Sequence, residues 1–283
     1  MSTTLIAFVD GSEYAESVCR HAGWIAGRSG ADVKVYHVMG RREAVAQSDL
    51  SGAIRLGART ALLDQLSQLD AERSKLAHEV GRAILEDAAN IIRESGVEVS
   101  TRLRQGDLLD TLTAKEDQGD IIIIGKRGEA AGLASDHLGS NLERVVRASH
   151  KPVFVANRAF KPIQKVLIAF DNGANALKAV DMFARNSAFA GQEVHLVHVG
   201  KQSPEMDTAL ERAKATLAAG GYDAQIDYRD GSASDVLSEM TAKEGYDLLV
   251  MGAYSHSRVR SLFLGSHTTE MVRACKVPVF LVR

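Results

Sequence analysis

Two aspartates and two glycine-bearing loops carry the residue types best suited to hold a charged ligand. In the first copy of the pattern, Asp10 follows an apolar run and Gly125 follows a run of four isoleucines. In the second copy, Asp171 and Gly252 stand at the corresponding places. A carboxylate can accept hydrogen bonds from a ribose or a base, while the N–H groups of a glycine loop can donate to phosphate. The pattern therefore indicates a nucleotide.

Each loop ends in a Leu-Gly-Ser triplet that precedes a helix-like stretch. The triplets are Leu138-Gly139-Ser140 and Leu264-Gly265-Ser266. The free N–H groups and the dipole of a helix start favour an anion, and serine adds a hydroxyl donor. Glycine lets the backbone approach the ligand because it has no Cβ. Both glycines and both serines are therefore candidate phosphate contacts, although the loops match neither a Walker A motif nor Gly-x-Gly-x-x-Gly.

These motifs belong to an internal repeat. The loops recur roughly 126 residues apart, whereas the opening apolar runs that end at Asp10 and Asp171 are roughly 161 residues apart. The first copy therefore has about 36 extra residues, which fall between 39 and 76. We expect a first domain at 1–158 with an insertion at about 39–76, and a second domain at 163–283. The short joint without a Gly/Ser-rich linker favours two domains that pack together.

Composition excludes several classes of protein. The 283 residues are 45% hydrophobic and 25% charged, with a formal net charge of −2, as in ordinary soluble globular proteins. There is no basic excess to suggest nucleic acid, no apolar run long enough to span a membrane, and no signal-peptide pattern at the start. We expect a cytoplasmic protein without nucleic-acid or membrane partners.

Strand-like and helix-like patterns alternate as β-α-β-α-β-α-β-α-β, twice. This alternation predicts an α/β fold with a parallel sheet covered by helices on both faces. Gly11 or Ser12 is placed to cap the first helix, and Gly30 and Gly96 to end helices. Ligands of such sheets bind at the carboxyl ends of strands where the strand order reverses, between the first and fourth strands. The predicted strands are Thr3–Val9, Asp32–Val38, Val97–Leu103, Asp120–Ile124, Pro152–Ala156, Lys165–Phe170, Glu193–Val199, Ala224–Tyr228, Asp247–Met251 and Pro278–Val282.

Taken together, the pattern resembles the universal stress protein family in its tandem, two-domain form. Nucleotide-binding members have an Asp after the first strand, Gly-x2-Gly-x9-Gly-Ser/Thr after the fourth, and a Pro-Val-x-Val final strand, similar to Pro152–Val155 and Pro278–Leu281 here. The resemblance implies two tandem Rossmann-like domains, each a five-stranded parallel sheet of order 3-2-1-4-5. It also implies antiparallel pairing of the two final strands within the chain, and it allows a homodimer.

The same resemblance implies ATP as the ligand, with or without Mg. The aspartate would lie near the ribose and base, and Val38 or Val199 near the adenine. The first copy has the second glycine of the motif, Gly128, but ten residues instead of nine, 129–138, separate it from Gly139-Ser140. The second copy keeps the spacing of nine but has Ser255 at the second glycine position.

Other residues give weaker signals. His195 and His198 lie three apart on one predicted strand, so they point to opposite faces and cannot share a metal ion; we expect no metal site. His37 and His198 occupy matched positions, which favours a structural role. Further side chains could contact phosphate or simply belong to polar loops, namely Lys126, Arg127, His256, Arg258, Arg260 and His267.

The insertion combines a loop-like segment at 48–54 with a long helical pattern. Its apolar stripe follows Leu62, Leu66, Leu69, Leu76 and Val80. This stripe could pack on its own domain, cover the first site as a lid, contact the other domain or form an oligomer seam.

No pattern in the sequence identifies catalytic residues. There is no nucleophile–base arrangement and no defined pair of acids, so we expect at most a slow ATPase. Three hypotheses stay open: a stress-response protein in which bound ATP regulates association with partners, a weak ATPase at the same sites, and a degenerate tandem protein that binds no nucleotide and acts only through protein contacts or another small ligand.

Overall fold

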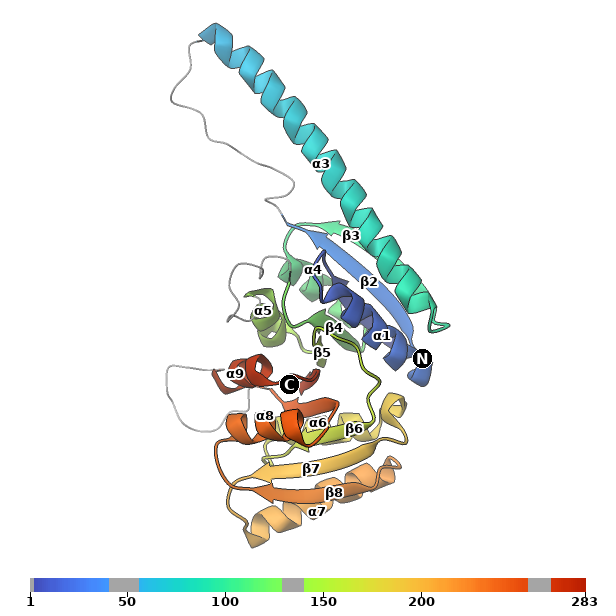
Figure 1. The fold of residues 1–283 in the computed structure, drawn as a ribbon, viewed down its shortest axis with the longest axis vertical. Helices are drawn as coiled ribbons and strands as arrows, with labels where there is room; N and C mark the ends of the chain where they lie inside the picture. The colour runs from blue at the N-terminus through green and yellow to red at the C-terminus, as the bar shows by residue number, and fades with distance from the viewer. Residues whose placement is uncertain (1–2, 41–55, 129–139, 254–265) are drawn as a thin grey trace.

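The computed structural model describes residues 3–40, 56–128, 140–253 and 266–283, whose strands form one ten-stranded sheet (Figure 1). The strand order is β3-β2-β1-β4-β5-β10-β9-β6-β7-β8, which confirms the order 3-2-1-4-5 in each half. The strands are β1 Thr4–Val9, β2 Asp32–Met39, β3 Val99–Gln105, β4 Ile121–Gly125, β5 Val153–Ala156, β6 Lys165–Ala169, β7 Glu193–Val199, β8 Ala224–Arg229, β9 Leu248–Gly252 and β10 Val279–Val282.

Helices cover both faces of the sheet, and alternate residues of each strand face them. Leu5 and Ala7 of β1 belong to the core under α1 and α3, whereas Ile6 and Phe8 belong to the core under α4 and α5. The second half repeats this arrangement. The helices are α1 Ala15–Ser29, α3 Leu56–Arg93, α4 Leu108–Lys115, α5 Ser140–Ala148, α6 Ala174–Ala184, α7 Pro204–Ala219, α8 Ala233–Lys243 and α9 Ser266–Ala274, with short 3₁₀ turns η1 Glu116–Gln118 and η3 Ser187–Phe189.

The two halves join through their final strands. β5 and β10 pair antiparallel, with Phe154 opposite Phe280, so the expected pairing is confirmed. Both phenylalanines are essentially buried, at 0% and 1% exposure, and their ring centroids lie 6.3 Å apart. The apolar core therefore runs without interruption from one half into the other.

Local sequence signals predicted most element boundaries, with two corrections. Gly30 adopts φ 68° at the end of α1 and Gly96 adopts φ 71° after α3, as expected for helix-ending glycines. The cap predicted at Gly11 or Ser12 is wrong, because the Ser12 hydroxyl instead accepts from the Tyr14 N–H at 3.3 Å and forms a turn before the helix. The third strand begins two residues later than predicted, at Val99.

The insertion forms most of α3, as the helical pattern predicted, whereas the expected loop at 48–54 lies outside the described residues. The C-terminal part of α3 packs on α1, β2 and β3, and the rest extends past the sheet edge (Figure 1). α3 lies at the opposite end of the sheet from β8, so its described part does not lie against the second half. None of the helices in the described ranges is both long and apolar enough to cross a membrane.

Candidate nucleotide-binding site

The first candidate site lies where β1 and β4 end side by side. The two strands pair in parallel with Phe8 opposite Ile124, so the residues that follow them meet at one edge of the sheet. Gly128 lies against the Asp10 carboxylate: a Cβ on Gly128 would stand 2.7 Å from Asp10 Oδ2. The structure thus brings the predicted acid and the second predicted glycine together, and a side chain at residue 128 would require the Asp10 carboxylate to move.

The aspartate of this site is fixed by its own turn. Asp10 Oδ1 accepts a hydrogen bond from the Ser12 N–H at 3.0 Å, which orients the carboxylate. Gly125 stands beside Tyr14, and a Cβ on this glycine would lie 2.8 Å from the Tyr14 Cβ. At Gly125 a side chain would meet the Tyr14 Cβ and the Arg127 carbonyl, whereas at Gly128 it would have to displace the Asp10 carboxylate.

The second candidate site repeats this geometry with different partners. The Asp171 Oδ1 accepts from the Gly173 N–H at 2.8 Å. A Cβ on Gly252 would lie 2.7 Å from the backbone nitrogen of Ala176, so this glycine is also required by close approach. Asn175 donates from Nδ2 to the Ala253 carbonyl at 2.6 Å and ties the start of α6 to the loop after β9.

Tyr14 and Asn175 are residues that the motif search did not single out. They occupy matched positions in the repeat, and each lies beside the glycine that ends the fourth strand of its half. The repeat alignment was the signal that could have identified them, since the residue four places after each site aspartate faces the other loop in both copies.

Matched histidines hold the two aspartate turns in place. His37 Nδ1 lies 2.9 Å from the Val9 carbonyl, and His198 Nδ1 lies 2.9 Å from the Phe170 carbonyl. In both halves the second strand thereby holds the last peptide of the first strand, directly before the aspartate. This supports the structural role expected for the pair, and the described residues contain no group of His, Cys, Asp or Glu arranged to hold a metal ion.

The two valines predicted near an adenine stand at the same edge of the sheet. Val38 precedes the last residue of β2, and Val199 is the last residue of β7. Both are partly buried and pack against the core on the α4/α5 and α8/α9 side. Since β2 pairs with β1 and β7 with β6, each valine lies one strand away from the site aspartate of its half.

Helices begin where the Leu-Gly-Ser triplets predicted them. Ser140 is the first residue of α5 and Ser266 is the first residue of α9. The helix starts thus follow the loops that leave β4 and β9, as an anion site requires. Further predicted residues lie outside the described residues, namely Gly139, Ser255, His256, Arg258, Arg260 and Gly265.

Lys126, a predicted phosphate contact, instead binds the C-terminal end of α9. Its Nζ donates to the carbonyls of Arg273 at 2.9 Å and Cys275 at 2.5 Å, at the C-terminal end of α9. A cation at this end of a helix is stabilised by the helix dipole. Burial lowers the pKa of the Lys126 ammonium, while the electrostatic effect of the Cys275 side chain opposes this shift. The lysine therefore links the first loop to the second half.

A reciprocal contact binds the other helix end. The Arg283 guanidinium, after β10, donates to the Arg147 carbonyl in the last turn of α5. Each helix that follows a candidate loop is thus held at its C-terminus by a cation from the opposite half. These contacts tie α5 and α9 each to the opposite half.

A second cation close to the first loop, Arg144 of α5, forms a salt bridge within its own half. Arg144 donates to both carboxylate oxygens of Asp107, at 3.0 Å each, and Asp107 also accepts from the Leu109 N–H as the cap of α4. The hydrogen bond from Arg144 lowers the pKa of the Asp107 carboxyl, and partial burial opposes that shift. Arg144 is therefore a structural cation rather than a ready ligand for phosphate.

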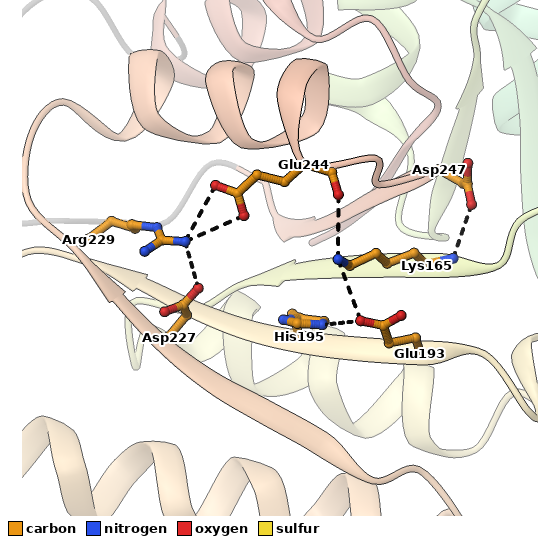
Figure 2. A network of polar contacts seen from close by, with 7 residues as sticks. All are labelled: Lys165, Glu193, His195, Asp227, Arg229, Glu244 and Asp247. Carbon is orange, nitrogen blue, oxygen red and sulfur yellow. Dashed lines mark hydrogen bonds and ion pairs between the residues drawn. The ribbon is translucent and has the colours of Figure 1, made fainter.

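A network of charged side chains in the second half lies away from both candidate sites (Figure 2). Lys165 and Glu193 are the first residues of β6 and β7, and Asp247 directly precedes β9, so this part of the network lies at the amino ends of the strands. Asp247 accepts from the Gln164 and Lys165 N–H groups at 3.0 and 3.1 Å and from Lys161 Nζ at 2.6 Å. These contacts hold the start of the second half, and they indicate a structural role.

The fold and the paired loops define a tandem Rossmann-like protein with a candidate ligand site at each reversal of strand order. The model of the universal stress protein family matches residues 1–157 and 162–283. Universal stress protein Slr1230 from Synechocystis sp. is 36% identical over 284 residues, which cover 99% of this chain and 99% of that protein. The chain belongs to the universal stress protein family.

Two further comparisons agree with the tandem arrangement. A universal stress protein from Thermus aquaticus is 26% identical over 133 residues, which cover 97% of that protein but 42% of this chain. The crystal structure of a universal stress protein from Archaeoglobus fulgidus superposes with a TM-score of 0.69 at 20% identity and covers 100% of this chain and 99% of that chain. The second comparison shows a common fold over the whole length.

Proposed function

We propose that this universal stress protein binds an adenine nucleotide, ATP, at the ends of β1 and β4 and of β6 and β9, and that it acts as a regulatory or interaction module. The observation that carries the proposal is the contact between Gly128 and Asp10, which leaves only backbone beside an oriented carboxylate. Backbone N–H groups beside an acid suit a ligand with both phosphate and ribose.

The chemistry of the two sites supports binding more than turnover. Asp10 and Asp171 each accept a backbone hydrogen bond two residues on, which suits an acceptor for ribose or base hydroxyl and amino groups. Magnesium would be held chiefly by the phosphates, since Mg²⁺ keeps several waters and takes few protein ligands. The proposed role is therefore that of a nucleotide-responsive binding protein.

The interaction-only alternative has one observation in its favour. Lys126 directs its charge to α9 and not to its own loop, so the first site lacks that cation for neutralising phosphate. If this alternative holds, the chain works through its surfaces alone.

The test is mass spectrometry of small molecules released by denaturing the purified protein, followed by calorimetric titration with ATP and Mg²⁺. We expect a retained adenine nucleotide, or binding of added ATP. Asp10→Ala or Asp171→Ala should each weaken binding at its own site about tenfold to a hundredfold, because each removes a charged hydrogen-bond acceptor. An empty protein that also binds no added ATP would contradict the proposal and favour the interaction-only alternative.

A glycine pair provides a matched control for the first site. Gly128→Ala should displace the Asp10 carboxylate and lower affinity at that site, since the new Cβ would stand 2.7 Å from Oδ2. Gly27→Ala on α1 introduces the same methyl group at ordinary contact distance, 3.4 Å from the Ser95 carbonyl, and should leave affinity unchanged. Equal affinity in all variants, with nucleotide still bound, would place the ligand elsewhere.

A further inference from the structure

α3 is far longer than its fold position requires. It has 38 residues, whereas α7, the matched helix of the second half, has 16. Its last turns pack on the first half through Leu85, Ala88 and Ile92, while the earlier turns extend past the sheet edge (Figure 1). Helices in proteins owe most of their stability to the packing of an apolar face. We therefore expect another surface to pack against these earlier turns.

The extended part of α3 presents an apolar seam, formed by Leu69, Leu76 and Val80 together with Arg73. The three apolar side chains are 49%, 60% and 51% exposed, and they are three of the four exposed large hydrophobic residues in the described ranges. Their spacing of seven and four, with Arg73 completing the pattern, is the a/d spacing of a coiled coil. Leu62 and Leu66 continue the same spacing in the sequence.

The seam is separate from the face that packs on the sheet. At 3.6 residues per turn, Leu85, Ala88 and Ile92 are rotated roughly 100–160° from Leu69 around the helix. The core contacts of the first half therefore leave the seam uncovered along its length. A single helix with a period of 3.5 in its exposed apolar residues fits another helix better than it fits a sheet or a small ligand.

We propose that this seam binds the same seam of a second copy of the chain as an antiparallel helix pair. Parallel pairing in register would set the two Arg73 side chains against each other in the apolar seam. Antiparallel pairing centred between Leu69 and Arg73 sets each Arg73 opposite Leu69 of the other copy, beside the other copy's Asp70 and Glu72. Each Arg73 guanidinium then lies beside carboxylates of the other copy, and the contact between the two Arg73 side chains is avoided.

Two further observations favour a second copy as the occupant. From Asp70 to Val80 the helix carries Asp70, Glu72, Arg73, Lys75 and Glu79, so both signs are interspersed and self-association brings no large net repulsion. The folded body joins α3 at its C-terminal end, so the antiparallel arrangement sets the two bodies at opposite ends of the helix pair (Figure 1). Such a contact is isologous and closes at two copies.

The interface is short, which sets the expected affinity. In the antiparallel register the two helices overlap from residue 62 to residue 80, a length of about 27 Å, so the contact belongs among the small protein interfaces. We expect a dimer with a dissociation constant on the order of 10 μM. The pairing uses neither candidate nucleotide site, so it does not depend on the proposed function.

Sedimentation velocity of the full chain over a range of concentrations tests the proposal. The seam variant combines Leu69→Lys with Leu76→Lys. The new lysine at position 69 precedes Glu72 by three residues and the one at position 76 follows Glu72 by four, so the helix itself keeps favourable charge pairs, while position 69 now faces Arg73 of the other copy with a like charge. We expect the dissociation constant to rise at least 30-fold, as for the loss of central interface residues. Leu177→Lys on α6, where the leucine is 46% exposed outside the seam, should leave it unchanged.

A spin label at Glu79→Cys tests the orientation in the same dimer. The antiparallel register separates the two labels by about 24 Å along the helix axis, whereas parallel pairing sets them side by side. A monomer at concentrations up to about 500 μM would overturn the proposal, as would a dimer that the seam variant leaves intact. A short distance between labels would overturn the antiparallel arrangement.

Discussion

The two halves of the molecule have the same strand order but differ in the segments that connect the strands. In both, a histidine of the second strand holds the last carbonyl of the first strand at 2.9 Å, and a glycine ends the fourth strand where no side chain fits. In contrast, the helix after the second strand has 38 residues in the first half and 16 in the second. The sheet thus has the same geometry at both candidate sites, while the connecting segments differ between the halves.

The comparison shows which residues the shared sheet requires and which differ between the halves. Residues that contact a neighbouring strand, such as His37 and His198, are equal in both halves because the same backbone geometry needs them. Loop residues differ: Gly128 corresponds to Ser255, and Lys126 corresponds to Ala253. We therefore expect equivalent substitutions to have equal effects in the sheet and unequal effects outside it. Three predictions test this expectation.

The largest effect is expected where the halves are most alike. Phe154 and Phe280 face each other across the joint and are both buried. Phe154→Ala and Phe280→Ala should each lower the free energy of unfolding by about 3–5 kcal/mol, because each leaves a cavity in the shared core. Urea denaturation followed by circular dichroism measures both. A difference of more than about 2 kcal/mol between them would break the equivalence of the two halves.

A pH-dependent effect is expected where the halves differ inside the core. His21 is buried, Nδ1 lies 2.7 Å from the Ser17 carbonyl, and Nε2 has no hydrogen-bond partner among the described residues. Burial lowers the pKa of His21 from 6.5 to about 4. As the pH falls from 6.5 toward 4, the unfolded chain gains a proton that the folded chain does not, so stability decreases, by up to roughly 3 kcal/mol.

His21→Met converts this position to its counterpart in the second half, Met182. The variant should lose less stability than the unsubstituted chain between pH 6.5 and pH 4 in urea titrations. His78→Met on α3 serves as a control and should retain the original pH dependence. If the His21 variant and the unsubstituted chain lose stability in parallel, the buried imidazole is not the source of the acid sensitivity.

The smallest effect concerns two matched aspartates that precede the fourth strands. Asp120 is exposed and accepts from the Thr4 N–H at 2.8 Å, whereas Asp247 is 6% exposed and accepts from two backbone N–H groups and from Lys161. Asp247→Ala should therefore cost about 1–3 kcal/mol more stability than Asp120→Ala, since it leaves more buried donors without an acceptor. Equal losses in thermal or urea unfolding would show that the network in Figure 2 contributes nothing beyond its counterpart.

Much of the fold could be predicted from the sequence because its signals are local. The four buried isoleucines of β4 have the continuous apolar pattern of a central parallel strand, and Gly30 supplies the left-handed residue that ends α1. The offsets of the repeat fixed the tandem arrangement and located the insertion. Both Leu-Gly-Ser triplets correctly predicted where α5 and α9 begin.

Contacts between distant segments could not be predicted in this way. The sequence shows Lys126 as a loop cation, but in the folded chain its ammonium binds carbonyls at the end of α9, 147 and 149 residues away along the chain. The third strand was misplaced by two residues because β3, at the edge of the sheet, is only half covered and its apolar pattern is weak. The Ser12 side chain caps a turn instead of α1, since two local hydrogen-bonded arrangements compete there.

The sequence by itself determined the repeated α/β fold, the edge of the sheet where the candidate site residues lie and the heptad spacing along α3. Periodicity, glycine positions and helix-start residues depend on neighbours within a few places in the chain, so they can be read without knowing the rest of the structure. Only the tertiary structure decided that Gly128 lies against Asp10, that Lys126 holds α9, and that Leu69, Leu76 and Val80 are left exposed. These outcomes depend on which distant surfaces meet when the core closes, and a local pattern carries no information about that.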